Sequence, residues 1–258
     1  FSCCGLNSIG IGSGGGVGKV TAEWMINGHI NEDLFIYDIK RFEKFHSKIS
    51  FFKERVTETL GDLYGMHWPY KQHKTSRNVK KLPYHNELKS FGACFGVSAG
   101  YERPMWFALD GEKAEYEYSY NYQNWYPSVE YETNNTLTNV GLYDLSPFSK
   151  FEIKSDKAHE DLQRICTSNI KQESGKCTYT HMLNNDGGIE TDLTVVCIHQ
   201  NHFRIISSAA TRERDKFHIK KHLSEGVELT DVTDDYCVFG IFGPKSRLLM
   251  QDLSSDDF

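Results

Sequence analysis

Three short segments in the second half of the chain alternate between apolar and polar residues and follow one another closely. They are residues 177–183, 189–198 and 203–207. NNDGG at 184–188 separates the first two, and HQNH at 199–202 separates the last two. Asn, Asp and Gly favour tight turns, and strands joined by such turns pair antiparallel. The pattern predicts an α+β fold with a mostly antiparallel sheet in this half.

Other signals in the same half add strands and helices. Residues 148–153 alternate as a further strand. Ser155 or Asp156 can cap a helix whose inner face holds Leu162, Ile165 and Cys166. Three more elements are predicted: a helix at 216–223, a strand at 236–242, and a helix at 245–253 that begins after Pro244. The tyrosine-rich stretch 111–126 has no clear period, so we interpret it as a connector into this domain.

The first third of the chain centres on a glycine-rich segment, which we interpret as a turn followed by a helix. Val17, Val20, Trp24 and Met25 form one apolar stripe on that helix, and Gly28 ends it. Residues 33–38 are predicted to form a strand, and residues 51–63 an amphipathic helix.

The glycine-rich segment is compatible with three interpretations. Residues 10–15 match G-x-G-x-x-G, and Asp38 follows 23 positions after Gly15, as in a dinucleotide fingerprint; five glycines among residues 12–18 also produce this match by chance. The segment does not match a P-loop, which would need Gly at position 13 and Ser or Thr at position 20, where the sequence has Ser13 and Val20. The backbone amides at the start of the helix can instead bind an anion or a polarised carbonyl, and a turn that only needs positive φ stays open as well.

Charge and cysteine usage exclude several classes of function. The formal charge is −6 with a pI near 6.0, which argues against nucleic acid as a partner. No apolar run has the length of a membrane span, so no membrane association is predicted. The seven cysteines include no C-x-x-C pair, which indicates a reducing compartment and no zinc site. We predict no metal; His199 and His202 are interpreted as surface residues.

The chain resembles a known family, the sarcosine and dimethylglycine dehydrogenases, across essentially its whole length. The resemblance is carried, in the family's order, by GLNSIGIGSGGGVGKVTAEWMINGH with FIYDIKRF, followed by six further motifs: SRNVKKLPYHNELKSFGACFG, YERPMWF, GLYDLSPFSKFEI, YTHMLNNDGGIETDLTVV, SSAATRERD and VFGIFGPKSRLLMQ. The resemblance implies the end of an FAD-binding α/β domain at residues 1–40, a central domain at 41–110, and the first part of a folate-binding, aminomethyltransferase-like domain at 111–258. The chain begins at Phe1 without methionine, and we expect it to be an internal fragment.

The resemblance also implies two groups of site residues. Those expected against FAD are Asn7, Ser8, Ile9, Gly10, Ile11 and Gly12. Those expected in the tetrahydrofolate site are Asp192, Leu193, Thr194 and Ile206, with Tyr179 as a wall for the pterin ring. Asp192 is the predicted catalytic residue, because a carboxylate there can orient folate nitrogens and assist proton transfer. Strand alternation places Asp192 and Thr194 on one face and Leu193 on the other.

The implied function is FAD-dependent oxidative demethylation of sarcosine or dimethylglycine in the mitochondrial matrix. The carbon unit passes to tetrahydrofolate, and electrons pass to an electron-transfer flavoprotein. The alternative is a non-catalytic regulatory subunit of pyruvate dehydrogenase phosphatase, which shares the architecture and acts through protein contact.

Overall fold

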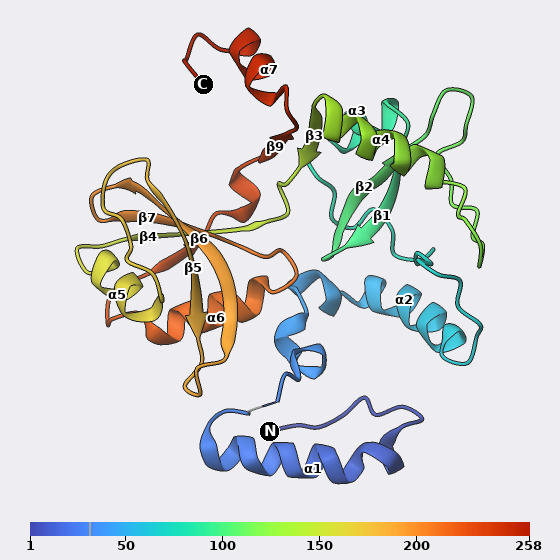
Figure 1. Ribbon diagram of the computed structural model, residues 1–258. Coiled ribbons are helices and arrows are strands. Elements are labelled where there is room, and N and C mark those ends of the chain that lie inside the picture. The colour runs from blue at the N-terminus through green and yellow to red at the C-terminus, as the bar shows by residue number, and fades with distance from the viewer. Residues whose placement is uncertain (31) are drawn as a thin grey trace.

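The largest unit of the molecule is a five-stranded antiparallel sheet with the order β5-β6-β7-β4-β8 (Figure 1). The structure is a computed structural model that describes residues 1–30 and 32–258, so Asn31, within the predicted 1–40 domain, lies outside the described residues. The strands are β4 (Ser149–Lys154), β5 (Cys177–Leu183), β6 (Ile189–His199), β7 (His202–Ser207) and β8 (Leu229–Asp231). The predicted antiparallel α+β architecture is confirmed.

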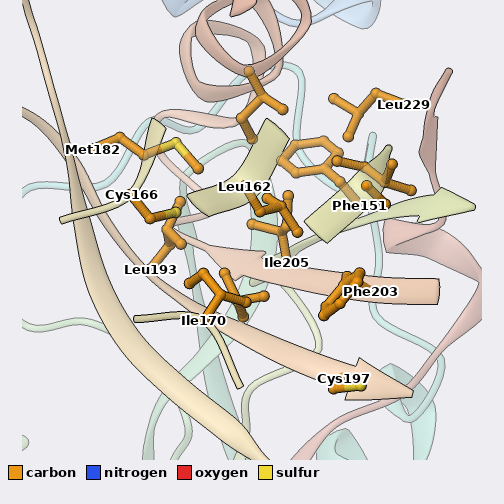
Figure 2. Packing of buried hydrophobic residues seen from close by; sticks show 14 residues of the cluster. Phe151, Leu162, Cys166, Ile170, Met182, Leu193, Cys197, Phe203, Ile205 and Leu229 are labelled. Atoms are coloured by element: carbon orange, nitrogen blue, oxygen red, sulfur yellow. The ribbon is translucent and has the colours of Figure 1, made fainter. Parts of the chain in front are cut away.

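Two helices cover one face of this sheet and enclose the hydrophobic core. They are α5 (Ala158–Ile165) and α6 (Arg212–His222). Figure 2 shows the inward side chains of the strands meeting those of the helices, with Phe151, Leu193 and Ile205 against Leu162. These four side chains are at most 2 % exposed. Alternation along each strand leaves the opposite face of the sheet free of this core.

A second, smaller unit is built on the hairpin β1 (Ala93–Ser98) and β2 (Tyr101–Phe107). The helices α3 (His85–Ser90) and α4 (Tyr126–Thr138) lie beside it (Figure 1). The strands β3 (Gly141–Asp144) and β9 (Phe239–Phe242) pair antiparallel, and α7 (Ser246–Leu253) follows them. The sequence did not predict β1, β2, α3 or α4.

The N-terminal third is helical and corrects two predictions. The helix α1 (Gly10–Asn27) contains the glycine-rich segment, so residues 10–18 are helical rather than a turn. Gly28 ends it with a φ of 75°, as predicted. Residues 33–38 are not a strand, because they contain the 3₁₀ helix Phe35–Tyr37, whereas the amphipathic helix is confirmed as α2 (Ile49–Asp62).

Several element bounds also differ from those predicted. The helix α6 begins four residues before the predicted 216, and the strand β9 begins three residues after the predicted 236. Residues 111–125 form a connector without helix or strand, as predicted. Within the described residues, no helix is long and apolar enough to cross a membrane.

Candidate functional site

The outer face of the sheet, opposite the core, carries the predicted folate residues. Asp192 is exposed and Thr194 half-buried, while Leu193 is 2 % exposed on the core side. The register pairs Tyr179 with Thr194 and Thr194 with Ile206, so three predicted residues form one row across β5, β6 and β7. Because the side chain of Leu193 belongs to the core, only its backbone can reach a ligand on the outer face.

Asp192 lies in the neighbouring row, opposite His181, and is oriented by a tyrosine. The Tyr179 hydroxyl donates to Asp192 Oδ2 at 3.1 Å, and this bond raises the pKa of Tyr179. Tyr179 is 61 % exposed, with its ring edge-on to that of His181 at 5.5 Å between centroids. One Asp192 oxygen thus has a fixed partner, while the aromatic face of Tyr179 stays accessible.

Behind Asp192, a buried carboxylate ties β6 to α6. Asp215 is 1 % exposed, and its Oδ2 accepts hydrogen bonds from the hydroxyls of Thr191 at 3.2 Å and Thr211 at 2.8 Å. Burial raises the pKa of Asp215. The sequence analysis did not identify this acid, because only the packing of α6 on the sheet brings Thr191 and Asp215 together.

On the β4 side of the sheet, the outer face is occupied by charged side chains whose hydrogen bonds are to other groups of the protein. Lys150, paired with Ile206, is 1 % exposed, and its ammonium donates to the carbonyls of Ser146 at 2.9 Å and Phe148 at 2.7 Å. Glu152, 5 % exposed, accepts a hydrogen bond from Arg204 at 2.6 Å. The accessible part of this face is therefore the β5–β6 side around Asp192.

The residues predicted to lie against FAD are located at the start of α1. Asn7, Ser8 and Ile9 form the turn before the helix, and Gly10, Ile11 and Gly12 form its first turn. No side chain caps this terminus and no acidic residue lies in the first turn, so its N–H groups need an acceptor from elsewhere.

The glycines of α1 leave a surface of bare backbone. A Cβ added at Gly12, Gly14, Gly15, Gly16 or Gly18 would meet nothing within 4 Å. An open helix face with free amide donors at its N-terminus suits the close approach of a flat ring that carries a carbonyl or a negative charge. The residues present thus fit the flavin edge that the resemblance implies.

The structure does not bring the two groups of predicted residues together. Among the described residues, no hydrogen bond or ion pair joins residues 7–12 to Asp192. A contact between the two regions lies after the end of α1, where His29 Nε2 is 3.4 Å from Asp186 Oδ2 in the β5–β6 turn. Two cavities, of about 390 and 450 Å³, lie elsewhere, and neither is lined by Asp192 or residues 7–12.

Three metal-ligating groups gather beside the larger cavity: Glu58 and Asp62 on α2, and His73 from the following loop. Their ligand atoms lie within 4.8 Å of one another. The two carboxylates already have protein partners, since Glu58 accepts from the amides of Lys74 and Thr75 and Asp62 accepts from Lys71 at 2.6 Å. These bonds assign the carboxylates to holding the loop after α2.

Two family models match the chain. Residues 27–81 match the FAD dependent oxidoreductase central domain, and residues 84–258 match the GCVT N-terminal domain. The matched ranges meet between residues 81 and 84. The domain limits at residues 40 and 110 stay a prediction.

Full-length relatives resemble the chain over nearly all of its residues. It is 37 % identical to 4-methylaminobutanoate oxidase (formaldehyde-forming) of Paenarthrobacter nicotinovorans, over 100 % of this chain and 31 % of that protein. It is 31 % identical to the mitochondrial pyruvate dehydrogenase phosphatase regulatory subunit of Mus musculus, over 98 % of this chain and 30 % of that protein. It is 29 % identical to the mitochondrial dimethylglycine dehydrogenase of Rattus norvegicus, over 97 % of this chain and 30 % of that protein. The chain spans less than a third of each relative.

A solved structure supports the fold of the second half. The glycine cleavage system aminomethyltransferase T from Bartonella henselae superposes with a TM-score of 0.53 at 22 % identity, over 67 % of this chain and 43 % of that one. With the central-domain match preceding the GCVT match, this chain belongs to the family of FAD-dependent amine oxidases and dehydrogenases that carry a GCVT N-terminal domain.

Proposed function

We propose that this chain supplies a tetrahydrofolate-binding face and a flavin-contacting helix terminus to an enzyme that oxidatively demethylates sarcosine or dimethylglycine. The observation that carries the proposal is Asp192, an accessible carboxylate held by the Tyr179 hydroxyl on the open part of the outer face. The oxidase and dehydrogenase relatives support the class of substrate, an N-methylated amino acid.

In this proposal Asp192 acts as a hydrogen-bond acceptor and proton acceptor. Its Oδ1 would bind a folate N–H and take up the proton released when that nitrogen adds to the methylene carbon of the oxidised amine. The transfer is complete when the bond between that carbon and the amine nitrogen breaks and the demethylated amino acid leaves with a proton on its nitrogen. The residues beside it would hold the ring system: Tyr179 by stacking, Thr194 and Ile206 by contact along the same row. The amides of Gly10, Ile11 and Gly12 would donate to the flavin carbonyl edge, where negative charge develops on reduction. FAD, when bound, supplies the hydride acceptor.

Location and electron acceptor follow from the same proposal. We place the protein in the mitochondrial matrix with an electron-transfer flavoprotein as acceptor; the mitochondrial relatives support this placement, as do seven free cysteines, which suit a reducing compartment.

Anaerobic titration of the chain with tetrahydrofolate, which carries an N–H at both N5 and N10, tests the folate assignment. Asp192→Ala removes a charge-assisted hydrogen bond, so we expect its Kd to rise about 10- to 100-fold in calorimetry. Glu190→Ala is the matched control, since it removes the same charge from the same face of β6 two residues away. Equal affinity of the wild type and Asp192→Ala would refute the role of Asp192.

The holoenzyme gives a second readout. We expect Asp192→Ala to keep flavin reduction by sarcosine while free formaldehyde replaces methylenetetrahydrofolate as the product. An unchanged yield of methylenetetrahydrofolate contradicts the proposed role.

The relative that is a phosphatase regulatory subunit keeps a second candidate function open, and a chain that binds no folate but binds the phosphatase would favour it.

A further inference from the structure

The stretch of β6 that carries Asp192 pairs with a neighbouring strand on one side only. On that side, Asp192 lies opposite His181 of β5. On the other side, the pairing with β7 begins at Leu193, which lies opposite Ser207, the last residue of β7. Among the described residues, no strand pairs with residues 189–192 on the β7 side. The course of this stretch therefore depends on contacts other than those of a regular sheet.

The pairing of this stretch with β5 is irregular as well. Thr191 lies opposite Met182, but the next pair joins Ile189 to Leu183, so Glu190 is an extra residue in β6. An extra residue of this kind is a β-bulge, which bends the strand and changes the direction of the side chains beside it. Asp192 follows the bulge by two residues, so its direction depends on what holds the bulge in place.

The beginning of α6 binds this stretch directly. The Arg214 guanidinium donates to the carbonyl of Glu190. One residue further along α6, Asp215 Oδ2 accepts a hydrogen bond from the Thr191 hydroxyl at 3.2 Å. The same hydroxyl oxygen lies 3.3 Å from the carbonyl oxygen of Asp192. Thr191 thus connects the Asp215 carboxylate to the backbone of Asp192.

Asp215 is a fixed partner in this connection. It is 1 % exposed, its Oδ2 also accepts from the Thr211 hydroxyl at 2.8 Å, and its Oδ1 lies 3.6 Å from Arg214 Nε. Thr191 is 5 % exposed. Because both side chains are buried, bulk water does not replace the bond between Thr191 and Asp215 when one partner is removed.

We propose that Asp215 is a positioning residue for Asp192 and acts through Thr191. The inference rests on the proposed function, in which Asp192 accepts a hydrogen bond from the folate. Asp215 lies on the core side of the sheet and does not touch the ligand. Its bond to Thr191 fixes the course of β6 after the bulge, and this keeps the Asp192 carboxylate on the outer face beside the Tyr179 hydroxyl.

The variant Thr191→Val tests the connection, because it removes the hydroxyl and keeps the shape of the side chain. We expect its Kd for tetrahydrofolate to rise about fivefold or more, the effect of one hydrogen bond. Thr178→Val is the matched control, because the Thr178 hydroxyl is also buried, lies on the neighbouring strand β5 and accepts from the Lys171 amide at 3.4 Å. This control should lose stability and keep its affinity for tetrahydrofolate.

Two variants of Asp215 show whether its role is to accept the hydrogen bond. Asp215→Leu removes the acceptor, so its Kd for tetrahydrofolate should rise as in Thr191→Val. Asp215→Asn keeps a side-chain oxygen that accepts from the two threonine hydroxyls, so we expect a Kd within about twofold of the wild type. Equal weakening of binding by both variants would contradict a positioning role through the Thr191 bond.

A double-mutant cycle distinguishes positioning from a general loss of structure. If Thr191 and Asp215 act through Asp192, Thr191→Val should weaken tetrahydrofolate binding in the wild type and add nothing in Asp192→Ala. Effects that add in full would mean that Thr191 stabilises the fold without acting on Asp192, and would overturn the proposal.

The hydrogen bond between Tyr179 and Asp192 gives a readout that needs no folate. In protein labelled with ¹³C at tyrosine Cζ, the signal of Tyr179 is identified by its loss in Tyr179→Phe. We expect Asp192→Ala, Thr191→Val and Asp215→Leu to move this signal in the same direction, and Thr178→Val to leave it in place. If no variant binds tetrahydrofolate, the proposed function fails and this signal still tests the positioning. A Tyr179 signal that moves in Asp192→Ala but stays in place in Thr191→Val and Asp215→Leu refutes the inference alone.

Discussion

Glu152 shows how a buried carboxylate stabilises the sheet beside the candidate folate site. Its oxygens accept from Arg204 at 2.6 and 3.1 Å, His202 Nε2 lies 3.0 Å away, and Lys154 lies at 3.2 Å. Burial alone would raise the pKa of Glu152, but the hydrogen bonds from Arg204, His202 and Lys154 outweigh it and lower the pKa to about 2. The carboxylate is therefore ionised in the folded protein down to low pH.

This shift predicts an acid-dependent loss of stability. A carboxyl group whose pKa is lower in the folded state stabilises it fully above the unfolded value of 4.5, and loses that contribution as pH falls toward 2. We expect Glu152→Gln to lower the free energy of unfolding by roughly 2 kcal/mol at pH 7 and to flatten the fall of Tm between pH 6 and 3. Calorimetry across this range measures both effects. Glu225→Gln, at an exposed position after α6, is the control, and equal slopes for Glu152→Gln and wild type would contradict the prediction.

For single residues, the sequence could predict which face of a strand a side chain occupies. The period of two along residues 189–198 was sufficient to place Asp192 and Thr194 opposite Leu193, because alternation is a local property of a strand. The bond between Tyr179 and Asp192 was not predictable, since it depends on the β5–β6 register and on one rotamer.

At the scale of elements, the strong periodicity of the sequence predicted β4 to β7. The strands β1 and β2 were not predicted, because their sequences are irregular. Pro104 lies inside β2, and the pairing with β1 shifts register between Cys94 and Phe95, so neither strand alternates cleanly. In α1, five glycines between residues 12 and 18 indicated a turn, because glycine disfavours helix by about 1 kcal/mol per residue. The helix forms despite this cost. Because glycine has no side chain, the helix exposes its backbone along these residues.

Substitution of a glycine in α1 tests the flavin assignment directly. Gly14→Ala meets open space, so it should stabilise the helix by about 0.5–1 kcal/mol in this chain, measured by amide hydrogen exchange in residues 10–27. In the holoenzyme, Gly14→Val should lower flavin content, because its side chain occupies the face that we assign to the ring. Gly61→Ala and Gly61→Val in α2 also meet open space and should leave the flavin content unchanged. Full flavin retention by Gly14→Val would exclude a ring at this face.

Across the whole molecule, α6 joins parts of the chain that are far apart in sequence. Its N-terminal half contacts the first forty residues through Lys40, whose ammonium lies 5.0 Å from the Phe217 ring, and through Arg214, whose guanidinium lies 4.8 Å from the Phe35 ring. Its inner face enters the core through Ile219. The sequence could not predict these contacts, because no local pattern records which distant segment a helix will meet.

Arg212, the first residue of α6, is the strongest of these links and should dominate a whole-molecule stability measurement. It donates to Asp231 on β8 at 2.9 and 3.0 Å, lies 3.5 Å from the Tyr101 hydroxyl of the hairpin, and lies 3.9 Å from Glu43. The Arg212 side chain is 12 % exposed and that of Asp231 14 %. Without Arg212, Asp231 would lose its bidentate partner and keep the Lys216 ammonium at 3.2 Å and the Thr233 hydroxyl at 2.7 Å, so its charge would be only partly compensated.

We therefore expect Arg212→Met to lower the free energy of unfolding by about 2 kcal/mol and to speed hydrogen exchange in β8 and in the β1–β2 hairpin together. Arg247→Met is the matched control, because its ion pair with Asp257 has side chains 73 % and 95 % exposed and should contribute less than about 0.5 kcal/mol. Denaturant unfolding with peptide-level exchange separates the two variants. A loss below about 1 kcal/mol for Arg212→Met, or faster exchange confined to β8, would mean that the hairpin and the sheet are held together by other contacts, since Arg212 is the side chain that bonds to Asp231 and also lies against Tyr101.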